Sequence, residues 1–315
     1  MVIDALLLQL GYNATLVAVG AMLLGVAAGM TGSFLYLRKR ALVSDAISHA
    51  TLPGVGLAFI VMVALGADGR NLPGLLLGSA LSAWAGLLCL GWLVRRTRLA
   101  EDAAIGAVLS VFFGFGIVLL TVIQTMSSGR QAGLENFLLG STAGMLRMDA
   151  LVIAGGGALI LLAIFILRRP MLEVAFDPEY AAARGLNVDR VDLAMMGLVM
   201  AVTVVGLKIV GLILIVALLI IPSVAARFWT DRADHVVLIG GILGGLAGYT
   251  GAAISAAVPN VPTGPIIVLI AFGLFALSLL FAPGRGVMAA LVRHLRFQHR
   301  VHLRKESGGV VMLQH

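Results

Sequence analysis

The chain has 315 residues, of which 60% are apolar and 12% are charged, and its mean hydropathy is +1.06. Because a water-soluble domain carries about 25% charged residues, this composition excludes a soluble fold and predicts a polytopic membrane protein. The 39 glycines favour closely packed helices over the alternating strands of a membrane β-barrel, so the expected fold class is all-α. The net charge of +7 comes from clusters beside apolar runs, which argues against nucleic-acid binding.

Long uncharged runs mark the predicted membrane spans, because a helix needs about 20 apolar residues to cross the hydrocarbon core. Seven such runs follow one another along the chain, and the second can begin as early as Leu42. The seven predicted spans lie near residues 14–37, 50–67, 71–94, 103–126, 149–167, 236–258 and 263–283. The first run follows Asp4 and no basic region, so we expect it to remain in the mature protein rather than be cleaved as a signal peptide.

A further apolar stretch, residues 193–226, is 34 residues long and is interrupted only by Lys208. It is either one overlong span or a hairpin of two short helices that turns near Lys208. Cytoplasmic loops collect Lys and Arg. With a hairpin, 18 basic residues share one side and four the other, whereas a single span gives ten against eleven and leaves Lys208 in lipid.

The hairpin therefore gives a polytopic bundle of about nine transmembrane helices, with the N-terminus outside and the C-terminus cytoplasmic. We assign residues 1–284 to this membrane domain and residues 285–315 to a basic cytoplasmic tail. Either helix of the hairpin is short for a core of about 30 Å, so we expect one of them to be tilted, broken or shielded by its neighbours.

Small residues recur at helical spacing in two places. Gly25 and Gly29 form one such pair, and Gly240, Gly244 and Gly248 form a longer row. Rows of this kind allow helix backbones to approach closely. We expect packing within one chain, with a dimer interface as the alternative.

A polar ridge lies between residues 44 and 49. Ser44, Asp45, Ser48 and His49 share one side of a helix, at membrane depth. An aspartate there is costly, so it requires a partner or a function. A carboxylate and a neutral imidazole at i and i+4 form half of a coordination sphere for a divalent transition metal, and two copies on a two-fold axis would complete a four-coordinate site. A proton relay and a purely structural pair satisfied by the serines are the alternatives.

The cytoplasmic loop after the fifth span carries the signature of a short helix. Asp177 is a suitable N-cap, and Pro178 suits the first helical position. Glu179 and Arg184 complement the two ends of the helix dipole. Gly185 can adopt the left-handed conformation that ends a helix.

So short a helix is not stable alone, and Phe176, Tyr180 and Leu186 offer apolar contacts to another surface. It is either a cap packed on its own domain or a docking element for a cytoplasmic partner. The chain has no phosphate-binding loop of the Gly-x-x-x-x-Gly-Lys-Ser/Thr type, so any ATP would be hydrolysed by another polypeptide. A single cysteine, Cys89, allows neither a disulfide framework nor a cysteine metal cluster, and no catalytic constellation stands out, so we do not expect an enzyme.

Four stretches of this sequence resemble the membrane permeases of ABC importers for zinc, manganese and iron. The stretches are Arg40–Phe59, Phe176–Gly185, Val210–Pro222 and Pro262–Pro265. The first is the most specific, and the likeness extends over most of residues 10–283.

The resemblance implies a permease subunit of the bacterial cytoplasmic (inner) membrane that carries a divalent metal ion and holds no permanently bound cofactor. It also implies three protein partners: an extracytoplasmic metal-binding protein, a cytoplasmic ABC ATPase and a second permease copy in a homodimer. Asp45 and His49 match the family's metal-contacting pair, and the segment from Asp177 to Gly185 matches its coupling helix. Glu135 lies in a family-like stretch without an assignable role.

Two other hypotheses compete with this one. An ion-gradient-driven secondary transporter would use Asp45 and His49 for proton coupling, and a purely structural membrane partner would need neither residue for transport. Manganese is the slightly preferred candidate for the transported metal. An Asp–His pair does not by itself choose, because oxygen ligands suit manganese and imidazole suits zinc. The basic tail is either the remnant of a regulatory domain, as some relatives have, or a contact for anionic lipid.

Overall fold

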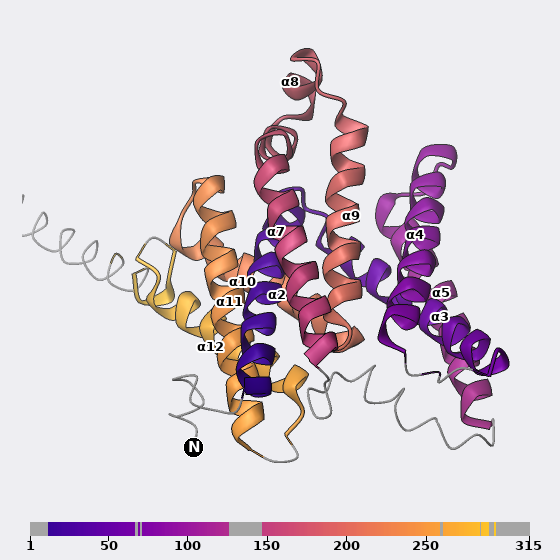
Figure 1. Ribbon diagram of the computed structural model, residues 1–315. Coiled ribbons are helices and arrows are strands. Elements are labelled where there is room, and N and C mark those ends of the chain that lie inside the picture. The colour runs from indigo at the N-terminus through magenta and orange to yellow at the C-terminus, as the bar shows by residue number, and fades with distance from the viewer. Residues whose placement is uncertain are drawn as a thin grey trace, which may run out of the picture.

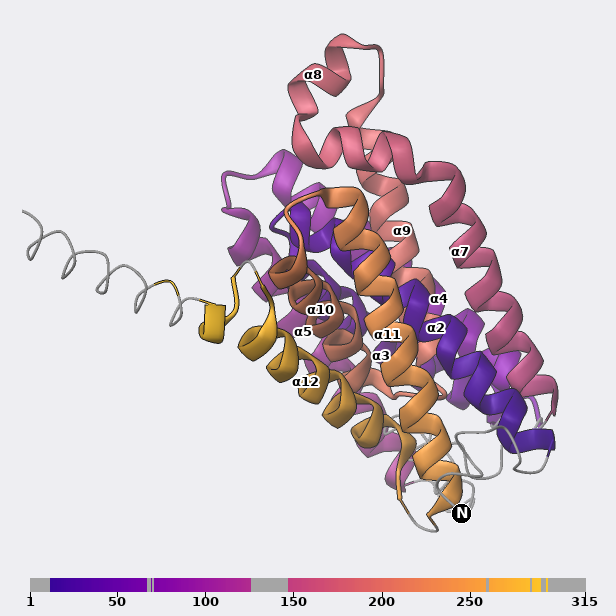
Figure 2. The same cartoon turned by 90° about the vertical axis from the view of Figure 1, so that its left-hand side faces the viewer.

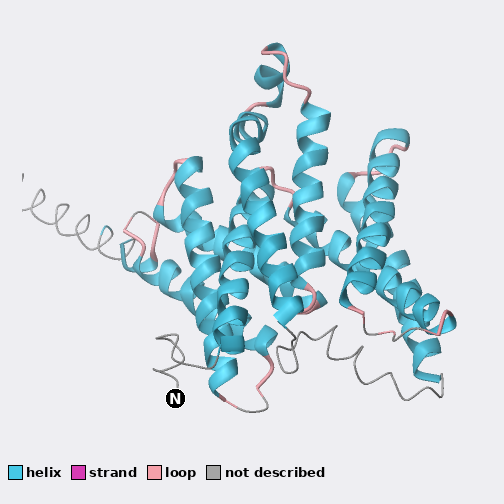
Figure 3. Ribbon diagram, in the orientation of Figure 1, coloured by secondary structure: helices cyan, strands magenta, loops and turns pink. Residues whose placement is uncertain are grey.

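The computed structural model describes residues 12–125 and 147–289, apart from 67, 68, 70, 259, 260 and 284, together with residue 293. Within these ranges all regular structure is helical, as the composition predicted (Figure 3). The main helices are α2 (Tyr12–Leu37), α3 (Ala41–Ala64), α4 (Leu72–Arg96), α5 (Glu101–Thr125), α7 (Arg147–Phe176), α8 (Pro178–Ala183), α9 (Val188–Gly206), α10 (Leu212–Trp229), α11 (Ala233–Ala257) and α12 (Thr263–Phe281).

Seven of these helices are long and apolar enough to cross a membrane, namely α2, α3, α4, α5, α7, α11 and α12. They correspond to the seven predicted runs. The second run begins at Ala41, one residue before the earliest predicted start at Leu42, so the polar ridge lies inside α3. The fifth extends beyond its predicted end, through Pro170 to Phe176. Figure 2 shows α7 bending in its last part, as expected where proline removes a helical hydrogen bond.

The stretch 193–226 is not one long helix. It contains most of α9 and α10, which are separated by residues 207–211 with Lys208 among them. Gly211 has φ = 85°, a conformation that glycine accepts and other residues resist, so it fixes the break. α9 packs mainly on α7 and α2, whereas α10 packs on α2, α11 and α12. Two statements remain predictions: that both helices span the membrane, and which end of the bundle faces the cytoplasm.

The two predicted glycine rows meet each other in the contact between α2 and α11, the most extensive in the described part of the chain. A Cβ atom added at Gly25 would overlap the carbonyl of Gly244, and one at Gly29 would overlap the carbonyl of Gly240. The absence of side chains therefore allows the two backbones to touch. This confirms packing within one chain at these rows.

The helices form two groups. Helices α3, α4 and α5 pack on one another, and they lie to one side of the molecule in Figure 1, with α10, α11 and α12 on the other side and α2, α7 and α9 between. The first group meets the rest mainly through contacts of α3 with α10 and of α3 and α4 with α9. The short helix α8 projects beyond the other helices at one end of the bundle (Figures 1 and 2), which is called the α8 end below.

Candidate functional site

Asp45 and His49 lie one turn apart on α3, as the spacing predicted. His49 Nε2 is 3.4 Å from Asp45 Oδ1, and the two side chains are 17% and 39% exposed. Two donor atoms that each lie about 2.1 Å from one tetrahedral ion are themselves about 3.4 Å apart. The pair is therefore spaced to bind one cation from one side, and its exposure leaves the other side open.

The His49 ring is held by an aromatic contact rather than by a hydrogen bond. Phe113 of α5 meets it edge to face, with ring centroids 4.9 Å apart and an interplanar angle of 80°. His49 Nδ1 is buried and has no hydrogen-bond partner in the described part of the chain. Metal-binding histidines usually donate this second N–H to a carboxylate, carbonyl or water, which fixes the ring. Here the ring orientation rests on Phe113.

The serines of the polar ridge point elsewhere. Ser44 Oγ donates to the carbonyl of Ala41 at 2.6 Å, and Ser48 Oγ lies 3.5 Å from Thr203 Oγ1 of α9. Both serines are fully buried, whereas Asp45 and His49 are not. The predicted shared face thus divides in two, because positions i and i+1 are about 100° apart around a helix. Ser44 therefore bonds within α3 and Ser48 contacts α9. Neither serine donates a hydrogen bond to Asp45 or His49 among the contacts of the described residues.

One chain offers few metal ligands in this region. Over the described ranges, no group of three or more His, Cys, Asp or Glu side chains is placed to hold a metal ion. Asp45 and His49 offer only two donor groups, so a four-coordinate site built on them would require two more from elsewhere.

An ion-pair cluster joins five helices at the α8 end. Asp192 of α9 accepts two hydrogen bonds from Arg38, at 2.7 and 2.9 Å, and one from Arg40 at 3.1 Å. Arg40 also pairs with Glu101 at the start of α5, at 2.9 Å, and Arg38 donates to the carbonyl of Val174 in α7. The connection between α2 and α3 is thereby tied to α5, α7 and α9. The sequence showed basic clusters beside the apolar runs but did not identify Asp192 as a partner of these arginines.

The predicted short helix forms as α8. Asp177 Oδ1 accepts a hydrogen bond from the backbone N–H of Tyr180 at 2.9 Å, as an N-cap should, and Pro178 begins the helix. Gly185 follows with φ = 86° and ends it. Arg184 pairs with Glu173 of α7 at 3.0 Å, a contact that the sequence did not reveal.

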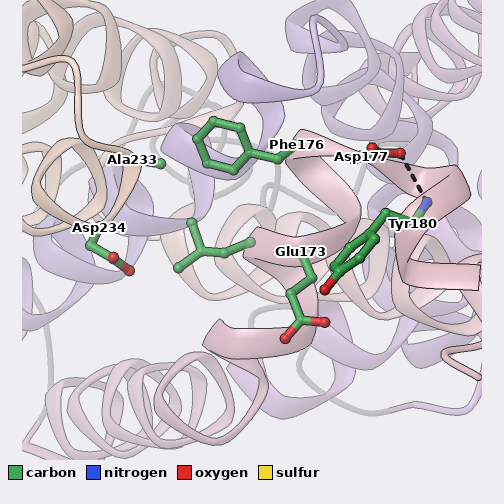
Figure 4. A pocket seen from close by; sticks show the side chains of 7 residues that line it. Glu173, Phe176, Asp177, Tyr180, Ala233 and Asp234 are labelled. Carbon is green, nitrogen blue, oxygen red and sulfur yellow. Dashed lines mark hydrogen bonds between the residues drawn. The ribbon is translucent and has the colours of Figure 1, made fainter. Parts of the chain in front are cut away.

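A cavity of about 400 Å³ lies between the α7–α8 corner and the start of α11 (Figure 4). Its lining residues are Leu172, Glu173, Phe176, Asp177, Tyr180, Ala233 and Asp234. None of these seven residues is basic, and three are acidic. Phe176 and Tyr180 are 67% and 57% exposed. Two exposed aromatic rings beside carboxylates form a surface that suits a partner with apolar and basic side chains.

A family model described as the ABC 3 transport family matches residues 12–282. The chain belongs to the ABC 3 transport family. It is therefore a multi-pass membrane component of an ABC transporter and not an enzyme, as the sequence indicated. The secondary-transporter alternative receives no support from membership of the ABC 3 family.

Individual relatives of this ABC 3 protein cover nearly its whole length. The manganese transport system membrane protein MntC of Bacillus subtilis is 40% identical over 94% of the chain and 67% of that relative. The zinc transport system membrane protein TroC of Treponema pallidum is 37% identical over 94% of the chain and 97% of that relative. Among solved structures, PsaBC from Streptococcus pneumoniae in complex with Fab matches with a TM-score of 0.76 and 31% identity, covering 94% of this chain and 98% of that chain.

Two predicted features fall outside the described residues. Glu135 lies in the segment 126–146, and the basic tail beyond residue 289 is described only at Arg293. Their roles, and the domain boundary at 284, remain predictions.

Proposed function

We propose that this chain is the permease subunit of an ATP-driven importer for a divalent transition metal ion. The observation that carries the proposal is the Asp45–His49 pair, whose 3.4 Å separation matches two ligands of one ion. Membership of the ABC 3 transport family supplies the class of transporter, and relatives named for manganese and zinc transport support the class of cargo.

The metal site is completed by a second copy of the chain. Each copy brings one carboxylate and one imidazole, so two copies related by a two-fold axis supply four ligands. The partial exposure of Asp45 and His49 in one copy supports this arrangement, because an ionisable pair at membrane depth must be covered by protein or line a water-filled path. Oxygen and imidazole ligands together bind manganese, zinc or iron, with manganese placed first.

The α8 end faces the cytoplasm and docks on an ABC ATPase. Lys and Arg cluster on this side in the predicted topology of nine spans, with the N-terminus outside. The acidic and aromatic cavity beside α8 suits basic and apolar side chains of that partner. Metal arrives from an extracytoplasmic binding protein, and ATP binding and hydrolysis move the two permease copies between outward and inward access.

Uptake by the reconstituted complex tests the transport proposal. Proteoliposomes that contain the permease and its ATPase should accumulate radioactive manganese only with ATP. Asp45→Ala or His49→Ala should lower the rate by at least the roughly tenfold that loss of an outer-shell partner of a metal ligand typically costs. Asp102→Asn is the control, because this exposed acid lies in the first turn of α5, away from the pair. Gradient-driven uptake without the ATPase, or full uptake by both alanine variants, would contradict the proposal.

Association with the ATPase tests the docking role of α8. Asp177→Ala removes an N-cap, which costs about 1 kcal/mol, and should weaken binding of the ATPase subunit. Asn187→Ala removes the equivalent cap of α9, where Asn187 Oδ1 accepts from the N–H of Arg190 at 3.0 Å, and should leave association unchanged. Equal association of both variants with the ATPase in a pull-down would count against docking through α8.

A further inference from the structure

A second cavity, of about 620 Å³, lies between α4 and α9 near the α8 end, where the two helix groups meet. Its inner wall is apolar and buried: Val43, Leu87, Leu90 and Met196 line it with exposures of 0%, 6%, 6% and 9%. Ligand pockets in proteins usually measure about 300–1,000 Å³ and have mostly apolar walls with a few polar groups. The cavity has the size and lining of a ligand site.

The outer rim of the cavity is also apolar but exposed. Leu88 and Trp92 of α4 and Leu193 of α9 are 54%, 62% and 45% exposed. Leu88 and Trp92 continue an exposed row on α4 that includes Leu81 and Trp84, at helical spacing. In a membrane helix such a row faces lipid, and tryptophan concentrates at the boundary with the headgroups. The cavity is therefore bordered by side chains that face the acyl chains of the bilayer.

Charged residues close the cavity at the α8 end: three arginines and three carboxylates line it, and with Arg38, which pairs with Asp192, the group carries one net positive charge. Arg40, Glu101 and Asp192 pair with one another and with Arg38. The remaining lining charges are Arg95, Arg96 and Asp189, and Arg95 lies 3.3 Å from Asp189 in an exposed pair. Exposed pairs of this kind hold their partners weakly. Arg96 forms no ion pair among the residues that the structure describes, so two arginines at the end of α4 remain able to bind an anion.

We propose that this cavity is a binding site for an anionic phospholipid of the leaflet at the α8 end. The phosphate binds Arg95 and Arg96, and an acyl chain enters the apolar cavity past Leu88 and Trp92. Basic pockets between membrane helices bind lipid headgroups in this way. A free metal cation does not suit the site, because the three carboxylates that line it are each paired with an arginine. A soluble anion would leave the buried apolar wall in contact with water.

Trp92 provides a local probe of this lipid. A protein with Trp84→Phe and Trp229→Phe retains Trp92 as its single tryptophan, since the chain has three. In nanodiscs, brominated phosphatidylglycerol should quench Trp92 at a concentration about fivefold lower than brominated phosphatidylcholine does, the preference expected for the one net positive charge that Arg95, Arg96 and Asp189 carry together. A protein that retains only Trp84, two turns deeper on α4, should show no such preference.

Charge variants distinguish a specific lipid-binding site from general attraction of anionic lipid to a basic surface. Arg95→Gln with Arg96→Gln should abolish the phosphatidylglycerol preference at Trp92. Arg168→Gln with Arg169→Gln removes an equal charge from α7, outside the cavity lining, and should leave the preference intact. Equal loss in both double variants, or no preference in the parent protein, would overturn the proposal.

A filling variant tests the acyl chain separately. Gly91 lines the cavity, and a Cβ atom added there meets nothing within 4 Å, so Gly91→Leu should fold and occupy the space. It should weaken quenching by brominated phosphatidylglycerol at least as much as the loss of both arginines. Gly106→Leu on α5, where the added Cβ also meets nothing within 4 Å, is the matched control. Unchanged quenching in Gly91→Leu, with elution and emission like the parent, would show that no chain enters the cavity.

Discussion

Asp192→Asn tests whether the ion-pair cluster at the α8 end holds the two helix groups together. Asp192 is 19% exposed and accepts three hydrogen bonds from Arg38 and Arg40, and Arg38 is itself only 13% exposed. Removing one partner of a largely buried pair leaves a charge without compensation, at a cost of about 3–5 kcal/mol. Because Arg40 retains Glu101 and some solvent reaches the cluster, we expect about 3 kcal/mol.

Thermal unfolding in detergent measures this loss. At about 2 °C per kcal/mol for a chain of this size, Asp192→Asn should lower the melting temperature by roughly 6 °C. Asp189→Asn is the control three residues earlier on α9, because its pair with Arg95 is 77% and 64% exposed and should contribute about 0–1 kcal/mol. Equal melting temperatures for the two variants would refute the structural role assigned to the cluster.

Three further substitutions test other contacts. Phe113→Leu should raise the KM for metal uptake about 2- to 10-fold with little change in maximal rate, because the ring pair contributes about 0.5–1.5 kcal/mol, whereas Phe115→Leu should not. Gly29→Leu should abolish a monodisperse folded species in size-exclusion chromatography, since its side chain overlaps α11, whereas Gly273→Leu, with open space around it, should elute normally. Gly211→Ala should cost about 1–3 kcal/mol in thermal unfolding, because its backbone lies in a glycine-only region.

The helix bundle was largely predictable from the sequence because the bilayer core places strict requirements on any segment that crosses it. Each spanning helix must be long, apolar and uncharged, so the runs are visible without knowledge of their neighbours. The glycine rows carried a second signal, since rows of small residues on two helices favour mutual contact. The break at Gly211 was visible only through the charge balance around Lys208, and the extension of α7 beyond Pro170 was not visible at all.

The site was only partly predictable, because its contacts depend on how helices are rotated against one another. Asp45 and His49 are neighbours on one helix, so spacing alone brings them together. Phe113 and Phe115 are the same residue type on the same helix, and only the rotation of α5 decides which one meets His49. Asp192 is 154 residues from Arg38 in the chain, and no local pattern connects them.

The division of the polar ridge has the same origin. The helical spacing was correct, but one residue of offset turns a side chain by about 100°. Ser48 consequently lies against α9, whereas His49 lies against α5 and remains partly exposed. A shared face predicted from sequence is therefore broader than the surface that any one ligand can touch.

The number of metal ions bound per chain tests most directly whether two copies share one site. Equilibrium binding of manganese to the purified permease with its ATPase, without nucleotide, should saturate at one ion for every two permease chains, and His49→Ala should abolish that binding. Saturation at one ion per chain, or binding that survives His49→Ala, would contradict a site built from Asp45 and His49 of two copies.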